Sequence, residues 1–291
     1  MVTRDIIGYT LPAHATEVDA AGLRAFARAI GETGSVYLDE NAARAAGYHS
    51  LPVPPTFLFC MDMDVPEPYA YLDDLGVDLG RVLHAEQSFH YHRIVGAGER
   101  LTFHSRITDI DTRKSGALTF MVRDTTVHDG KQTLVAELRS VIVVRNTPAP
   151  PSRMPPPETT APEDWTATLY PPRVSREILV RYADASGDHN PIHVDPAFAR
   201  QHGLDDVIAH GMLAVAYLGR MLTNWVTQPA LHSLRVRFVR MIEVHDQLAC
   251  RGRIAETWQE NGMQRARLEL QVIGPDQDLR IVGDAVVTLH D

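Results

Sequence analysis

The segment ASGDHNPIHVD, residues 185–195, places an aspartate and a histidine five positions apart, at Asp188 and His193. Between them, Asn190 favours a tight turn and Pro191 stops a helix from continuing, so the two side chains can fold toward a common point. An imidazole with a pKa near its usual value of about 6.5 exchanges protons at neutral pH, whereas a carboxyl group does so only if burial raises its pKa from about 3.9. The spacing therefore indicates a proton-transfer pair.

The chain contains a second copy of this segment. Residues 29–39 read AIGETGSVYLD, and a gapless comparison of residues 182–203 with residues 26–47 finds seven identities in 22 positions, where average composition gives roughly two. The copy has Glu32 in place of the aspartate and Tyr37 in place of the histidine. We therefore predict an internal duplication with one active site per chain.

The shared residues of the two copies are those that begin and end helices. Asp39 and Asp195 stand where a helix N-cap is expected, and Gly47 and Gly203 stand where a glycine would end that helix about two turns later. Farther along, YHRIVGAGERL (91–101) parallels FVRMIEVHDQL (238–248) at an offset of 147 instead of 156. The first copy therefore has a nine-residue insertion, which we place near residues 63–80.

The second half shows a clear order of elements. Hydrophobic periodicity and turn residues predict helices over 175–185 and 211–223, followed by strands over 233–242, 247–257, 263–273 and 279–290. A long helix followed by a run of antiparallel strands is typical of an α+β layer in which a curved sheet wraps a helix.

Composition limits the classes of function. The chain of 291 residues is 44% hydrophobic and carries 37 acidic against 28 basic residues, so two domain-sized cores and no nucleic-acid partner are expected. The two cysteines, Cys60 and Cys250, indicate neither a disulfide framework nor a zinc site. With neither a signal-peptide pattern nor an apolar run long enough to span a bilayer, we expect a cytoplasmic protein with no membrane partner. Residues 146–172 hold nine prolines in 27 positions and are predicted to be a linker.

The segment YADASGDHNPIHVDPAFARQHGLDDVIAHGML, residues 182–213, resembles the signature of the R-specific enoyl-CoA hydratases, the MaoC-like dehydratases of hotdog fold. The first half resembles the non-catalytic hotdog unit of two-domain members. The resemblance implies an α+β double hotdog, with a degenerate unit at 1–145, the proline-rich linker at 146–172 and a catalytic unit at 173–291.

The resemblance also implies roles for particular residues. Asp188 and His193 would be the catalytic pair, and the resemblance does not assign which is the acid and which the base. The Gly211 amide would bind the oxyanion. Unpaired amides at a helix N-terminus suit a developing negative charge, and a glycine there lets a thioester approach closely. The aligned first-half residue is Pro55, which has no N–H. The residues expected to bind substrate are Asn190, His210 and Met212.

The implied reaction is the reversible hydration of a trans-2-enoyl-CoA to the R-3-hydroxyacyl-CoA, with no cofactor other than coenzyme A as part of the substrate. The alternatives are a dehydratase acting on a carrier-protein-bound 3-hydroxyacyl chain, a thioesterase, and a non-catalytic subunit that binds acyl thioesters. Partners are therefore expected to be acyl-CoA or acyl-carrier-protein thioesters, and a homodimer of double hotdogs is a further expectation. Chain length and oligomeric state stay open.

Three other patterns in the sequence could indicate binding sites. His90 and His92 share one strand face, but the sequence shows no third ligand, so we assign no metal. The apolar run that contains Phe57, Phe59 and Met61 could line an acyl tunnel, but we expect it to belong to the hydrophobic core. Alternating arginines in the last strands could bind phosphate, but we expect them to form a solvated face of the sheet. They are Arg235, Arg237, Arg251, Arg253, Arg265 and Arg267.

Overall fold

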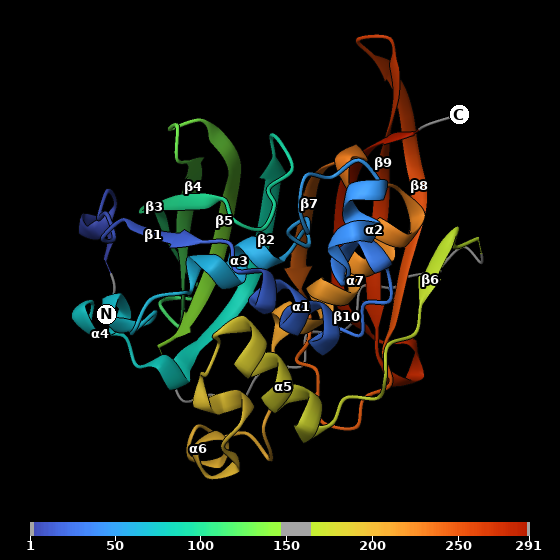
Figure 1. The fold of residues 1–291 in the computed structure, drawn as a ribbon. Helices are drawn as coiled ribbons and strands as arrows, with labels where there is room; N and C mark the ends of the chain where they lie inside the picture. The colour runs from blue at the N-terminus through green and yellow to red at the C-terminus, as the bar shows by residue number, and fades with distance from the viewer. Residues whose placement is uncertain (1–2, 147–163, 290–291) are drawn as a thin grey trace.

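The computed structural model describes residues 3–146 and 164–289, and their strands form one antiparallel sheet in the order β1-β3-β4-β5-β2-β7-β10-β9-β8-β6 (Figure 1). This order is palindromic, because each strand of the first half has its counterpart at the mirrored place in the second half. The halves join where β2 pairs with β7, with Phe89 opposite Leu234. The strands are β1 (His14–Glu17), β2 (Val82–Tyr91), β3 (Arg100–Arg113), β4 (Leu118–Asp129), β5 (Leu134–Arg145), β6 (Ala167–Leu169), β7 (Leu231–Phe238), β8 (Ala249–Glu260), β9 (Met263–Ile273) and β10 (Leu279–Leu289).

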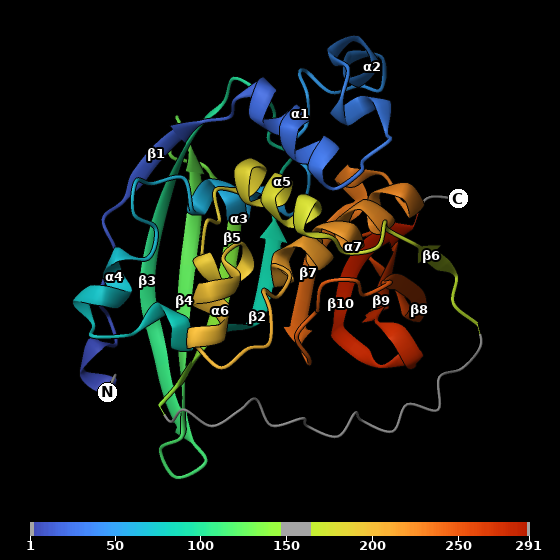
Figure 2. The same ribbon diagram turned by 90° about the horizontal axis from the view of Figure 1, so that it is seen from below.

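The helices gather on one face of this sheet, as the view from below shows (Figure 2). They are α1 (Ala20–Ala29), α2 (Glu40–Ala45), α3 (Phe57–Asp62), α4 (Ala70–Asp74), α5 (Arg176–Ser186), α6 (Pro196–Gln201) and α7 (Gly211–Trp225), with short 3₁₀ turns η1 (Arg4–Ile6), η2 (Ser35–Tyr37), η3 (Leu79–Arg81), η4 (Pro191–His193), η5 (Gln228–Ala230) and η6 (Pro275–Gln277). A single large core of buried residues runs through both halves. The α+β double hotdog expected from the sequence is confirmed. In the described part of the chain, no helix combines the length and apolar character needed to cross a membrane.

The structure confirms the internal duplication in detail. Asp39 accepts a hydrogen bond from the Ala42 amide at 2.8 Å, and Asp195 accepts the equivalent bond from the Phe198 amide at 3.2 Å. Two isolated bridges, Pro52 with Gly96 and Ile208 with Glu243, are equivalent at offsets of 156 and 147. The insertion therefore lies between residues 52 and 96, where α4 has no counterpart in the second half.

The two central helices differ in length, which the sequence did not anticipate. Helix α7 runs for 15 residues, whereas α3 has six, all of them buried. The prolines at positions 66 and 68 explain the difference, because each lacks an amide donor and disfavours a helical residue before it. The first unit therefore wraps a short helix, and the insertion follows directly.

The boundary of the second unit also needs a correction. Most of the proline-rich segment, residues 147–163, lies outside the described residues. Strand β6, however, falls inside the predicted linker and pairs with β8, with Thr168 opposite Arg251. Because β6 is the edge strand of the sheet, the neighbouring prolines are tolerated there. The second unit thus begins before residue 173.

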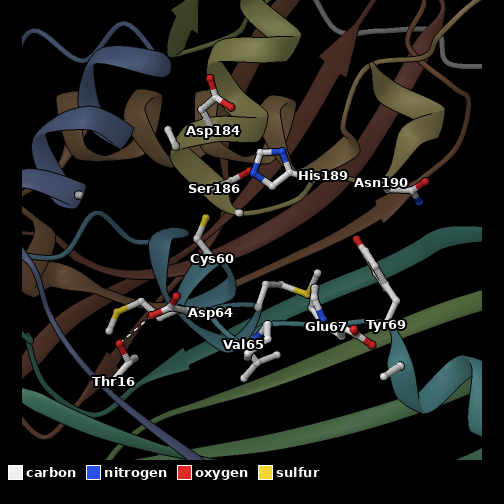
Figure 3. Close-up of a pocket in the computed structure, with 18 of the residues that line it drawn as sticks. Thr16, Cys60, Asp64, Val65, Glu67, Tyr69, Asp184, Ser186, His189 and Asn190 are labelled. Atoms are coloured by element: carbon white, nitrogen blue, oxygen red, sulfur yellow. Dashed lines mark hydrogen bonds between the residues drawn. The ribbon is translucent and has the colours of Figure 1, made fainter. Parts of the chain in front are cut away.

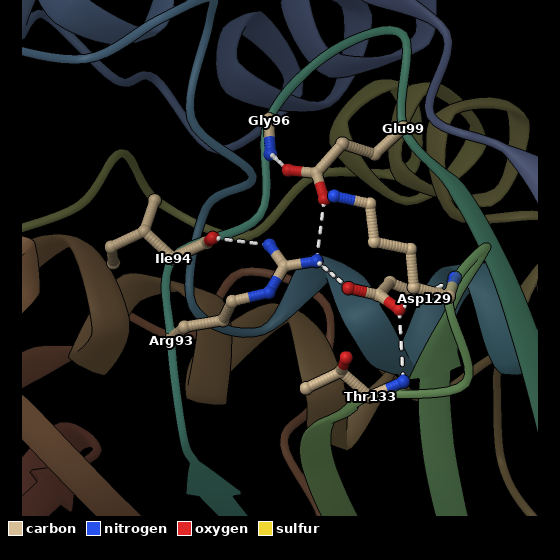
Figure 4. Close-up of polar contacts among 7 residues, drawn as sticks. Arg93, Ile94, Gly96, Glu99, Asp129 and Thr133 are labelled. Carbon is tan, nitrogen blue, oxygen red and sulfur yellow. Dashed lines mark hydrogen bonds and ion pairs between the residues drawn. The ribbon is translucent and has the colours of Figure 1, made fainter.

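An ionic cluster fixes the turn between β2 and β3 to the hairpin between β4 and β5 (Figure 4). Arg93 donates to Glu99 at 2.7 Å and to Asp129 at 2.9 Å. Asp129 in turn accepts from the Thr133 amide at 2.9 Å. Backbone hydrogen bonds and the Arg93 guanidinium hold the pKa of Asp129 at about 2. The cluster holds together two turns that are distant in the sequence.

Candidate active site

The Asp188 loop is formed by local interactions that the sequence specifies. Helix α5 ends at Gly187, which adopts the left-handed conformation with φ of 75°, a conformation that favours glycine. Asn190 then caps η4 through its side chain, which accepts from the Ile192 amide at 3.2 Å. Pro191 occupies the first position of that turn. The loop thus directs Asp188 and His193 to the same side.

Asp188 is 7% exposed, and the contacts of its side chain are specific. Its Oδ1 accepts a hydrogen bond from the Tyr69 hydroxyl at 2.6 Å and a longer one from the Asn190 amide at 3.3 Å. Tyr69 lies 119 residues away, in the insertion of the first unit. The other carboxylate oxygen has no hydrogen-bond partner among the described residues.

Two histidines face this carboxylate. The Nδ1–H of His193 donates to the Ile208 carbonyl at 2.8 Å, which leaves its Nε2 as the free, basic nitrogen. His210 donates from Nε2 to the Asp188 carbonyl oxygen at 3.0 Å, and its ring centroid lies 3.9 Å from that of His193. His210, predicted to bind substrate, is 1% exposed, and its hydrogen bond ties the loop to the start of α7.

The protonation states of these three groups depend on their burial and on their mutual interactions. Burial alone would raise the pKa of Asp188, but His193, His210 and the Tyr69 hydrogen bond outweigh burial and hold this pKa below its ordinary value. Burial lowers the pKa of His193, against the opposing effect of Asp188. Burial also lowers the pKa of His210, to about 3. The condition under which Asp188 would exchange protons near neutrality, a pKa raised by burial, is therefore not met, and at neutral pH the carboxylate is ionised beside neutral imidazoles.

Gly211 begins α7, so its amide has no intrahelical acceptor. A Cβ atom at this position would lie 2.6 Å from Cε1 of Phe238, the last residue of β7. The glycine is thus required by a packed aromatic ring, a reason that the sequence did not show. Met212 is 3% exposed, and its side chain belongs to the core.

In the first unit, the residues aligned with Asp188 and His193 make contacts that stabilise the fold. Glu32 accepts from the amides of Thr33 at 2.8 Å and Gly34 at 2.7 Å. The Tyr37 hydroxyl donates to Gln228 at 2.9 Å. Glu32 thus holds its own loop, and Tyr37 joins the two units.

A cavity of about 670 Å³ lies between the insertion and the Asp188 loop. In Figure 3, Asp64, Glu67 and Tyr69 line one side, and Ser186, His189 and Asn190 line the other. Its buried apolar residues are Phe57, Cys60, Met61 and Met63, and its exposed carboxylates are Glu17, Asp19, Asp64, Glu67, Asp73 and Asp184. Phe57 and Met61, expected to be core, therefore also line a cavity, as does the predicted substrate-binding residue Asn190. Asp188, His193 and Gly211 are not among the residues that line this cavity; Asp188 contacts the cavity wall through the Tyr69 hydroxyl.

Sequence reasoning missed two side chains at this site. Tyr69 could have been sought in the insertion, which is the feature that the first copy does not share with the second. His84 is packed between Phe59 and Phe238, with ring centroids at 5.6 and 4.8 Å, and burial lowers its pKa to about 4. No sequence signal points to His84, because its role depends on the two units meeting.

Among the described residues, two groups of side chains have the spacing for a cation. Asp188, His193 and His210 are one group. The other joins His90 and His92 to Glu137 on β5, a third ligand that the sequence did not reveal. Several of the alternating arginines form ion pairs across the sheet, for example Arg253 with Glu269, which favours the solvated-face interpretation.

Together, the two-unit sheet and the carboxylate–imidazole pair beside a helix N-terminus define a double-hotdog protein with one candidate acid–base site. Comparison with known families agrees. Residues 5–138 match the FAS1-like dehydratase domain region, and residues 157–272 match the MaoC-like domain. A Streptomyces griseus protein of the UPF0336 group is 35% identical over 143 residues, which is 49% of this chain and 94% of that protein.

Solved structures support the fold. One described as a MaoC-like dehydratase superposes with a TM-score of 0.82 at 21% identity, covering 98% of this chain and 99% of that chain. A Mycobacterium tuberculosis protein described as having a double hotdog fold gives a TM-score of 0.67 at 12% identity, covering 97% and 96%. The chain is a MaoC-like double-hotdog protein, with a FAS1-like dehydratase domain region in its first half and a MaoC-like domain in its second. These domain matches support an activity of the hydratase or dehydratase type.

Proposed function

We propose that this protein catalyses the reversible hydration of a trans-2-enoyl-CoA to the R-3-hydroxyacyl-CoA. The main support for the proposal is that the Asp188 carboxylate and the free Nε2 of His193 lie near each other, close to the N-terminus of α7. Addition of water to an enoyl thioester needs a base for the water, a proton donor for C2 and donors for the thioester oxygen. The site has a candidate for each requirement.

The protonation states indicate how the proton moves. With Asp188 ionised and His193 neutral, the resting site holds two proton acceptors. A water oxygen bonds to C3 while one of these groups takes its proton, and the double-bond electrons move toward the thioester carbonyl. The conjugate acid then returns the proton to C2, so the net addition is one water molecule. Delivery from one side of the substrate makes the addition syn, and the Gly211 amide stabilises the oxygen that becomes negative.

The cavity is the candidate binding site for the acyl group. Its buried surface is formed by Phe57, Cys60, Met61 and Met63, whereas its exposed polar side chains are mainly carboxylates. Carboxylates repel phosphate, so we place the acyl chain in this cavity and the phosphates of coenzyme A outside it. The reaction needs no cofactor beyond the thioester.

Hydration of crotonyl-CoA and longer enoyl-CoAs, followed by the loss of ultraviolet absorbance, tests the proposal. Asp188→Asn and His193→Gln should each lower kcat by about 10²–10⁴-fold, the usual contribution of general acid–base groups. Glu32→Gln and Tyr37→Phe, which alter the aligned positions of the first unit, are the matched controls and should retain wild-type kcat.

Two outcomes would contradict the proposal. In one, the wild type hydrates no enoyl thioester, and the Asp188 and His193 variants bind acyl-CoA as tightly as it does, which would favour a non-catalytic binding subunit. In the other, the variants hydrate as fast as the wild type. Activity only on carrier-protein-bound chains would move the substrate to the dehydratase alternative.

A further inference from the structure

The insertion in the first unit has no counterpart in the second unit, yet it reaches the catalytic loop of the second unit. It contains Pro66 and Pro68, then Tyr69 at the N-cap of α4. Tyr69 lines the cavity (Figure 3). Its hydroxyl lies 2.6 Å from Oδ1 of Asp188. The degenerate unit thus makes a direct polar contact with the proposed catalytic carboxylate.

Given the hydration function above, we propose that Tyr69 is a positioning residue: its hydroxyl holds Oδ1 of Asp188 and thereby directs Oδ2 toward the reacting water. Two observations support this role. Besides the long contact to the Asn190 amide, the Tyr69 hydroxyl is the hydrogen-bond donor to this side chain among the described residues. Charge-assisted hydrogen bonds of this length are among the strongest that a side chain makes, so the contact restricts rotation of the carboxylate.

The hydroxyl also affects the charge of Asp188. Burial raises the pKa of Tyr69 well above its ordinary value, so Tyr69 stays protonated and remains a donor at every pH at which the protein is assayed. Its hydrogen bond helps to keep the carboxylate ionised against the desolvation that burial imposes. The other titratable groups that face Asp188 come from five elements or their caps: Cys60 of α3, His84 of β2, Tyr182 of α5, His193 of η4 and His210 at the cap of α7.

Tyr69→Phe removes the hydroxyl and keeps the ring that lines the cavity. Tyr71→Phe is the matched control, because Tyr71 lies on the same short helix but faces Arg123, with 5.9 Å between the guanidinium carbon and the ring centroid. We expect Tyr69→Phe to lower kcat by about 10-fold, the effect of losing a hydrogen bond to a charged group, with little change in KM. Tyr71→Phe should retain the wild-type kcat.

The pKa of Asp188 gives a readout independent of turnover. It can be followed by NMR of protein labelled with ¹³C at the aspartate carboxyl carbon, with the Asp188 signal assigned by its loss in Asp188→Asn. Removal of a donor to the ionised form raises a carboxyl pKa, so this pKa should rise in Tyr69→Phe and stay unchanged in Tyr71→Phe. The limb of the pH–rate profile that reports Asp188 should move to higher pH by the same amount.

The outcomes separate this inference from the proposed function. An unchanged kcat and an unchanged Asp188 pKa in Tyr69→Phe would overturn the positioning role. A raised KM in Tyr69→Leu, with wild-type behaviour in Tyr69→Phe, would overturn it too and show that Tyr69 serves only as a cavity wall. If the Asp188 pKa rises in Tyr69→Phe but the wild type hydrates no enoyl thioester, the contact is upheld and the function is refuted.

Discussion

The role of the Gly211 amide can be isolated by comparing two substitutions at that position. Gly211→Pro removes the N–H, whereas Gly211→Ala keeps it, and both introduce a Cβ atom. Proline suits the first position of a helix, and His210 before it has φ −55° and ψ 123°, which is the backbone conformation favoured before proline. The ratio of the two activities therefore reports the amide itself.

Both substitutions meet the same steric obstacle. The new Cβ would lie 2.6 Å from Cε1 and 2.9 Å from Cδ1 of Phe238, closer than side chains tolerate, so the ring must move. Overpacking of this kind costs about 1–3 kcal/mol of the free energy of unfolding. We would therefore make both changes in a Phe238→Leu background, in which the interfering ring is absent.

We expect kcat of Gly211→Pro to be about 10²–10³-fold below that of Gly211→Ala in this background, the loss typical of one missing oxyanion donor. The assay is hydration of an enoyl-CoA at saturating concentration, with the melting temperature measured to confirm folding. Equal kcat values in two folded variants would refute the assignment of this amide to the oxyanion. A strong loss already in Gly211→Ala would show that the thioester itself needs the space.

Three further predictions concern stability and the degenerate unit. Asp62→Asn should lower the free energy of unfolding, measured by urea denaturation, by about 3–5 kcal/mol. The buried Arg123 guanidinium lies 2.6 Å from the Asp62 carboxylate, and the substitution leaves it without a counter-ion. A loss below about 1 kcal/mol would contradict this reasoning. Asp129→Asn should lower the melting temperature at pH 7, and the difference from wild type should shrink as pH falls toward about 2, since a depressed carboxyl pKa stabilises the fold only above that pH. A difference that is constant with pH would show that the charge is unimportant. Restoring the active-site residues in the first copy should create no second site, so adding them to an inactive Asp188→Asn chain should give no hydration; the changes are Glu32→Asp, Tyr37→His and Pro55→Gly.

The sequence by itself determined the local parts of this protein. The caps at Asp39 and Asp195, the turn at Asn190 and Pro191, and the start of α7 at Gly211 follow from preferences that act within a few residues, and the structure has each of them. Comparison of the chain with its own repeat also located the insertion. The fold class could be predicted because alternating strands and one long apolar helix allow few arrangements.

Only the tertiary structure decided what surrounds Asp188. Its pKa is lowered in spite of burial, because His193 of the same loop acts together with His210 and Tyr69, which lie 22 and 119 residues away in the sequence. The ring that requires Gly211 to be a glycine comes from the end of β7. Such contacts depend on how the two units join through β2 and β7, and short-range preferences in the sequence carry no information about distances across that junction. The candidate pair can therefore be found from its loop, whereas the charge of Asp188 also depends on contacts from distant residues of both units.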